Sequence, residues 1–146
     1  MESQKTDFIE ALKQEFGQFS FVSGPRFKWK PPKTVYFEQN STYPLQYFAL
    51  LTLHELGHAL CSHKDYKTDV ERLKIESEAW QRAKCLISEH QNWQKTYGIT
   101  YDEDFAESEL DSYRDWLHRR SKCRNCGLTR FQTEDGLYHC PNCDLL

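Results

Sequence analysis

The sequence LLTLHELGHALCSH, residues 50–63, is an apolar segment interrupted by histidines and a glutamate, and it falls within a helix predicted over residues 44–63. Positions i and i+4 of a helix share one face, so His54 and His58 can direct both imidazoles at one metal ion. Glu55 lies one step round the helix, near that metal but free to act on water bound to it. The spacing supplies two nitrogen ligands and one carboxylate base, which zinc-dependent hydrolysis requires.

A third protein ligand is expected on the next helix, which is predicted over residues 70–93. Glu76 shares a face of this helix with small and apolar residues at helical offsets. We expect that face to pack on the helix that carries the two histidines, so Glu76 is the predicted third ligand. Glu78 points about 200° away from Glu76 at 100° per residue, and it is the alternative ligand.

Residues 54–60 (HELGHAL) and 76–83 (ESEAWQRA) together resemble the ImmA/IrrE-type metallopeptidases of the gluzincin group. The resemblance covers residues 5–120 and implies a compact zincin, in which a small sheet precedes the H-E-x-x-H helix and a later helix supplies a glutamate. Trp80 departs from the family pattern, which usually has Asn or Asp at this position. Members of the family commonly cut or inactivate repressor proteins of bacteria and mobile elements, which implies a protein substrate.

The tail of the chain contains two C-x-x-C pairs, CRNC at 123–126 and CPNC at 140–143. In a cytoplasmic chain such pairs indicate zinc rather than disulfides. Residues 129–133 and 137–139 can pair as a hairpin across an Asp-Gly turn. Four thiolates close a tetrahedron, so we predict a zinc ribbon whose metal is structural and not catalytic. The predicted ligands are Cys123, Cys126, Cys140 and Cys143.

Weaker patterns predict the other elements of the chain. Apolar spacing indicates helices over residues 5–17 and 102–120, and glycine and proline make residues 19–32 a loop with short extended pieces. Residues 34–38 (TVYFE) indicate a strand, and we expect it to offer an exposed sheet edge to an extended substrate.

These elements predict an α+β fold with two domains. The first, residues 1–121, is expected to be a zincin-like metallopeptidase domain, with a small sheet packed on three to four helices. The second, residues 122–146, is the four-cysteine zinc ribbon.

Composition limits the class of protein. Lys plus Arg is 19 and Asp plus Glu is 22, and the resulting net charge of −3 argues against a globally basic nucleic-acid binder. No apolar run approaches the roughly 20 residues that cross a bilayer, and the N-terminus lacks a signal-peptide pattern. We expect a cytoplasmic protein with a protein substrate and no membrane partner. For the ribbon we favour contact with protein over contact with nucleic acid.

The predicted function is that of a zinc-dependent endopeptidase with two zinc ions per chain, one catalytic and one structural. Glu55 is the predicted catalytic base. No residue stands out as the oxyanion donor, for which Tyr47, Tyr113 and Arg114 are candidates. The alternatives are a protease similar to the SprT-like proteases, which act on DNA-bound proteins, and a non-catalytic binding module stabilised by zinc.

Overall fold

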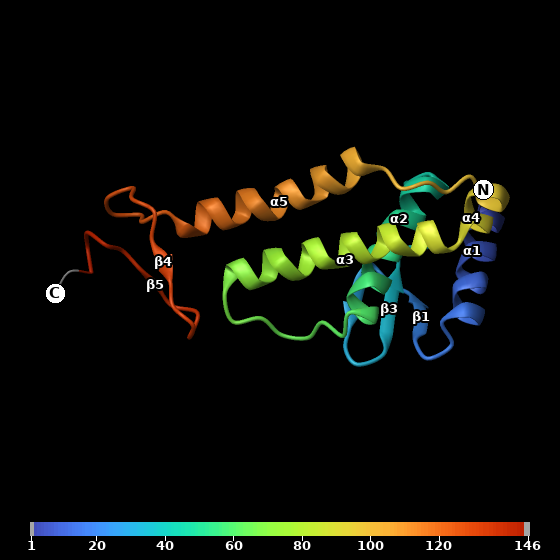
Figure 1. The fold of residues 1–146 in the computed structure, drawn as a ribbon, viewed down its shortest axis with the longest axis horizontal. Coiled ribbons are helices and arrows are strands. Elements are labelled where there is room, and N and C mark those ends of the chain that lie inside the picture. Colours follow the sequence, from blue (N-terminus) through green and yellow to red (C-terminus); the bar gives the residue numbers. More distant parts are fainter. Residues whose placement is uncertain (1, 145–146) are drawn as a thin grey trace. The chain divides into compact units, whose positions relative to one another are not determined.

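The computed structural model describes residues 2–144 as an α+β chain of helices and short strands, which confirms the predicted fold class (Figure 1). In chain order the elements are α1 (Glu2–Glu15), β1 (Ser20–Ser23), β2 (Lys28–Lys30), β3 (Thr34–Phe37), α2 (Leu45–Leu60), α3 (Asp69–Glu89), α4 (Gln91–Tyr97), α5 (Glu103–Ser121), β4 (Phe131–Gln132) and β5 (Tyr138–His139). The helix predicted over residues 70–93 is interrupted at His90, so α3 and α4 are separate helices.

The three-stranded sheet has the order β1-β3-β2, with β1 parallel and β2 antiparallel to β3. The predicted strand over residues 34–38 is therefore central. The expectation that it offers an exposed edge to a substrate is wrong, because both of its sides are hydrogen-bonded to neighbouring strands. The edges belong to β1 and β2, which formed in the segment expected to be a loop with short extended pieces. Their strand structure comes from pairing with β3 and not from a strand pattern of their own.

The chain divides into two compact units. The first unit contains the residues up to Lys64 together with Glu78–Asp102. Its core is built on α2, which is buried along most of its length, and on the apolar face of α1. The side chains of Val35 and Phe37 alternate with more exposed neighbours along β3 and add the contribution of the sheet.

Helices α2 and α3 approach closely within the first unit, at Gly57 and Ala79. A Cβ atom on Gly57 would lie 2.4 Å from the backbone oxygen of Ala79, so only glycine fits at this position. This close approach holds the part of α3 that carries Ala79 and Trp80 against the helix of the H-E-x-x-H motif.

The second unit contains Asp65–Ser77 and the chain from Glu103 onward. A buried carboxylate, Asp69, connects its parts. Its Oδ2 accepts hydrogen bonds from Arg120 Nε (2.7 Å) and from the Tyr138 hydroxyl (2.5 Å). The backbone N–H of Asp69 donates to Gln132 Oε1 at 2.6 Å. The start of α3, the end of α5 and the β4–β5 hairpin are thereby linked.

This division differs from the predicted domain boundary after residue 121, because it groups the ribbon with the first part of α3 and with all of α5. Independent unfolding of residues 122–146, which the predicted boundary implies, stays a prediction. Among the helices of residues 2–144, none combines the length and the apolar character that crossing a bilayer requires.

Candidate metal centres

The first candidate centre is made by His54, Glu55 and His58 in the second half of α2. One possible ligand atom from each residue lies within 4.8 Å of those of the other two. The rings of His54 and His58 are 4.7 Å apart between centroids, as expected for positions i and i+4 of a helix. His54 Nε2 lies 3.7 Å from Glu55 Oε2. The predicted convergence of these three side chains is present in the structure.

The surroundings of this cluster suit a metal ion. His54 and His58 are only 6% and 5% exposed, on a helix whose other faces are packed with aliphatic and aromatic side chains. Two imidazoles and a carboxylate in an apolar setting are costly to bury unless their polar atoms are satisfied. Nitrogen and oxygen donors of this kind are those that zinc binds in proteins. The chemistry of the donor set therefore fits zinc.

Trp80 from α3 holds the ring of His54 in place by stacking. The two rings are 4.4 Å apart between centroids and inclined by 24°, and Trp80 is 2% exposed. Sequence reasoning noted Trp80 only as a departure from the family pattern, which expects a hydrogen-bonding residue at this position. In this chain a flat aromatic surface restricts the imidazole instead.

His63 contacts the other imidazole, that of His58. Their Nδ1 atoms are 2.9 Å apart, and His63 Nε2 lies 3.2 Å from Glu78 Oε1. The sequence analysis identified Glu78 only as the alternative ligand. The structure brings His63 and Glu78 into one hydrogen-bonded chain that ends at His58.

Glu76, the predicted third ligand, is buried on α3 with 7% of its surface exposed, whereas the side chain of Glu78 is 49% exposed. Glu76 lies one helical turn before Trp80 and shares its face with Ala79 and Ala83, which are also buried. The face of α3 that was predicted to be buried is buried in the structure. The role of Glu76 as a metal ligand stays a prediction, because Glu76 belongs to the second unit and the histidines to the first.

The three candidate oxyanion donors are each engaged with neighbouring side chains. The Tyr47 hydroxyl donates to Asp102 at 3.2 Å, and the hydrogen bond and charge of Asp102 raise the pKa of Tyr47. Arg114 pairs with two carboxylates of its own helix, and Tyr113 lies under the guanidinium of Arg72. Of the three candidates, Tyr47 is in the same unit as His54, two turns earlier on the same face of α2.

The second candidate centre is the cluster of the four ribbon cysteines, whose sulfurs lie within 4.8 Å of one another. The sulfurs of Cys123 and Cys143 are 3.8 Å apart, and those of Cys126 and Cys140 are 3.5 Å apart. A tetrahedron with sulfurs about 2.3 Å from zinc has edges of roughly 3.8 Å. These two sulfur–sulfur distances are close to the edge of such a tetrahedron, so the cluster could hold a metal ion.

Backbone N–H groups donate hydrogen bonds to sulfurs of this cluster. Those of Cys126 and Asn125 lower the pKa of the Cys123 thiol to about 6, which favours the thiolate that binds metals. In the second pair the N–H of Cys143 donates to Cys140 Sγ at 3.3 Å. Residues 131–132 and 138–139 pair as the predicted hairpin, with Gly136 in its turn at a φ of 87°.

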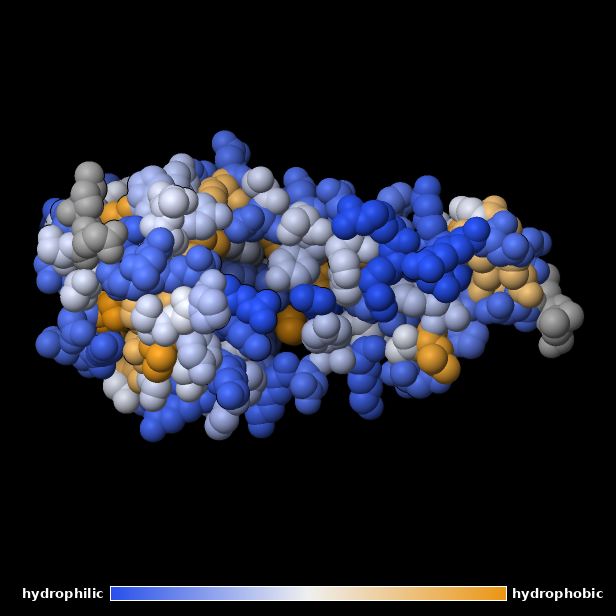
Figure 2. Space-filling view, turned by 180° about the vertical axis from the view of Figure 1, so that it is seen from behind, coloured by the Kyte–Doolittle hydropathy of each residue, from blue (hydrophilic) through white to orange (hydrophobic). Residues whose placement is uncertain are grey.

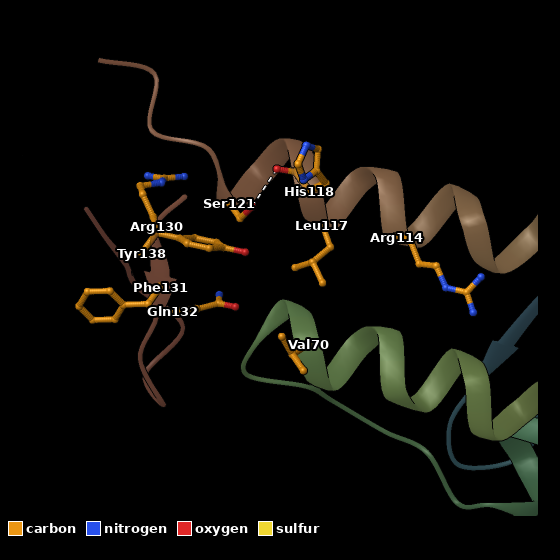
Figure 3. Close-up of a pocket in the computed structure, with 9 residues that line it drawn as sticks. All are labelled: Val70, Arg114, Leu117, His118, Ser121, Arg130, Phe131, Gln132 and Tyr138. Atoms are coloured by element: carbon orange, nitrogen blue, oxygen red, sulfur yellow. Dashed lines mark hydrogen bonds between the residues drawn. The ribbon is translucent and has the colours of Figure 1, made fainter. Parts of the chain in front are cut away.

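The ribbon also borders a groove of about 490 Å³ in the second unit (Figure 3). Figure 3 shows Leu117 pointing from α5 toward the start of α3, with the ring of Tyr138 directed from β5 toward the helices. Figure 2 shows hydrophobic surface at the ribbon end of the chain, where Leu128, Phe131 and Leu137 are exposed. The groove and this surface depend on a folded ribbon, since the hairpin forms part of both.

Comparisons of the chain with models of protein families, with curated proteins and with solved structures find no match. The resemblance to the ImmA/IrrE-type metallopeptidases therefore rests on the two sequence motifs. What the structure adds is two groups of side chains that could each hold a metal ion.

Proposed function

We propose that the protein is a zinc-dependent endopeptidase with a zincin-like fold. The observation that carries this proposal is the convergence of two buried imidazoles and a carboxylate on consecutive turns of α2. His54, His58 and Glu76 would hold the catalytic zinc, and Glu55 would act as the base. A purely structural metal site has no use for a carboxylate beside its two histidine ligands.

The residues divide the work of peptide hydrolysis between them. When bound, zinc polarises the scissile carbonyl and lowers the pKa of its water to about 7. Glu55 accepts a proton from the attacking water and later donates it to the nitrogen of the leaving amine as the C–N bond breaks. The imidazoles of His54 and His58 would contribute nitrogen lone pairs to the metal. The apolar packing around α2 limits the access of bulk water.

An extended peptide is the substrate form that suits the sheet of the first unit. Because β3 is paired on both sides, a substrate strand can add only to β1 or β2. We assign it to β2, which packs against α2, the helix of the predicted base. The family resemblance suggests a repressor protein or another regulator of a mobile element as the substrate.

The ribbon is proposed to hold a structural zinc and to contact a protein partner. Its four thiolates would leave no position open for water or substrate. Its exposed side chains Leu128, Phe131 and Leu137 suit protein contact better than contact with phosphates. The preferred catalytic function therefore rests on the first centre alone.

The test is whether cells that express the protein accumulate fragments of a cleaved substrate protein. Proteomics is expected to find these fragments with the wild-type chain and with the control Glu89→Gln, which changes an exposed carboxylate of α3. They are expected to be absent with Glu55→Gln, because this variant lacks the base. The same fragments from a zinc-loaded Glu55→Gln protein would refute the proposed mechanism. Absence of any fragment with the wild type would favour the non-catalytic binding module, and stimulation of cleavage by DNA would favour the SprT-like alternative.

A further inference from the structure

We propose that His63 and Glu78 are positioning residues that hold His58 in the tautomer able to bind a metal through Nε2. The three side chains form one hydrogen-bonded series, Glu78–His63–His58, within the first unit. The consequence for metal binding rests on the proposed function. The assignment of the His58 proton to Nδ1 rests only on the contacts of these side chains.

The positions of the protons on His63 and His58 follow from the carboxylate of Glu78 at the end of the series. Glu78 ends the series with a half-exposed carboxylate, whose oxygens accept hydrogen bonds. His63 must therefore donate through Nε2, and in a neutral imidazole this leaves Nδ1 of His63 as an acceptor. The contact of 2.9 Å between the two Nδ1 atoms then requires His58 to be the donor. A neutral His58 with its proton on Nδ1 keeps the lone pair of Nε2 for a metal.

The backbone places His63 for this purpose. Helix α2 ends at Leu60, and Ser62 takes a left-handed conformation with a φ of 57°. The N–H of Ser62 then bonds to the carbonyl of Ala59, and the N–H of His63 bonds to that of His58, both at 3.0 Å. This pair of bonds is the Schellman arrangement, which turns the chain back over the last helical turn. His63 is thereby returned to the side chain of His58.

Packing holds the ring of His63 in this position. Its side chain is 10% exposed, and its ring meets that of His58 edge to face at 5.1 Å between centroids. The indole N–H of Trp29 donates to the backbone carbonyl of His63 at 2.8 Å. The left-handed backbone of Ser62 and the hydrogen bond from Trp29 therefore both fix His63, a residue that takes no direct part in the proposed reaction. Metal-binding histidines commonly donate their second nitrogen to such an outer partner.

The first test needs neither bound zinc nor activity. In the complete chain, with the first centre emptied by mild chelation, ¹⁵N NMR at pH 8 reports which nitrogen of His58 is protonated. We expect Nδ1–H in the wild type and in His63→Asn, because the asparagine oxygen can take the place of the accepting nitrogen. We expect His63→Leu to lose this preference. A wild-type His58 protonated on Nε2 would overturn the proposal.

The second test measures zinc affinity by competition with a chromophoric chelator. His63→Leu is expected to weaken binding at the first centre by about 10- to 100-fold, as for other outer-shell partners, and His63→Asn to restore it. Glu78→Ala should weaken binding less, and Glu78→Gln should bind like the wild type because its amide oxygen still accepts. Glu89→Ala is the matched control on the same helix, and it should change nothing.

The variants separate this proposal from the proposed function. Equal zinc affinity of folded His63→Leu, Glu78→Ala and wild-type proteins would refute the positioning role. If NMR shows Nδ1–H on His58 while even the wild type binds no zinc at this centre, the proposed hydrogen-bonded series is supported and the peptidase proposal fails. Should His63→Leu not fold, Glu78→Ala and the wild-type NMR measurement still decide the outcome.

Discussion

Glu55 and Glu76 carry the same chemical group, but the proposed site gives them different roles. Glu55 follows a histidine ligand on α2 and is assigned to proton transfer, whereas Glu76 is buried on α3 and is assigned to the metal. An amide can replace either carboxylate without a change in size. Substitution by glutamine therefore distinguishes a base from a ligand.

We expect Glu76→Gln to reduce the zinc content of the first centre, with any activity falling as a consequence. Glu55→Gln should keep the zinc and lose activity by roughly 10²- to 10⁴-fold, the usual contribution of a positioned proton-transfer group. Elemental analysis and cleavage rates on purified variants provide the comparison. Retention of zinc by Glu76→Gln would refute its role as third ligand.

At the scale of the elements, the crossing of α2 and α3 determines which side chains surround the first centre. It brings Trp80 onto His54 and Glu78 onto His63, and it depends on the close approach at Gly57. The helices are long enough to form a packed core, but a side chain at the crossing point would separate them. One methyl group is therefore a sharp probe of this geometry.

We expect Gly57→Ala to destabilise the first unit by at least about 1–3 kcal/mol, because the new methyl meets backbone and no flexible side chain can give way. Gly17→Ala is the control, since its Cβ would lie an ordinary 3.7 Å from the backbone oxygen of Lys13. Urea unfolding of both variants measures the difference. Equal stability of Gly57→Ala and the wild type would show that the helices do not cross as closely as described.

At the scale of the whole molecule, Asp69 makes the stability of the second unit dependent on pH. Burial alone raises the pKa of this carboxyl, but hydrogen bonds from Tyr138 and Arg120, with the charges of Arg120 and Arg72, lower it below its ordinary value. A lowered pKa means that the folded state favours the ionised carboxylate. Its contribution is present above the unfolded-state pKa and is lost as the pH falls through the folded-state pKa.

The expected result is a wild-type chain that is more stable than Asp69→Asn at pH 7. The difference should shrink as the pH falls through the folded-state pKa of Asp69, which lies below the ordinary value of an aspartate. Unfolding of both proteins followed at several pH values tests this. Both lose metal from the ribbon in acid, so that loss does not contribute to the difference in stability between them. A difference that stays constant down to the lowest pH would exclude the carboxylate charge as its source.

The ribbon provides the second prediction at this scale. Cys140→Ser should remove one of two zinc ions and unfold residues 122–146, because so small a segment has little core of its own. We expect the zinc at His54 and His58 to remain. Elemental analysis and limited proteolysis report the two outcomes. Unfolding of the first unit in this variant would mean that the predicted boundary after residue 121 does not separate independent domains.

Local periodicity was sufficient to predict several features from the sequence. A spacing of four on a helix brings His54 beside His58, and the same periodicity predicts the buried face of Glu76. The two C-x-x-C pairs and the Asp-Gly turn likewise predict the sulfur cluster and its hairpin. Each of these features depends on residues close together in the chain, so the geometry of one element determines it.

Tertiary structure decided the features that join distant residues. Strands β1 and β2 exist because they pair with β3, and this pairing makes the predicted edge strand central. Trp80 reaches His54 and Glu78 reaches His63 only where α3 packs on α2. Asp69 meets Tyr138 across 69 positions of sequence. Such contacts depend on how the elements pack and not on the sequence pattern within any one element. The periodicity of a single helix or strand therefore cannot predict them.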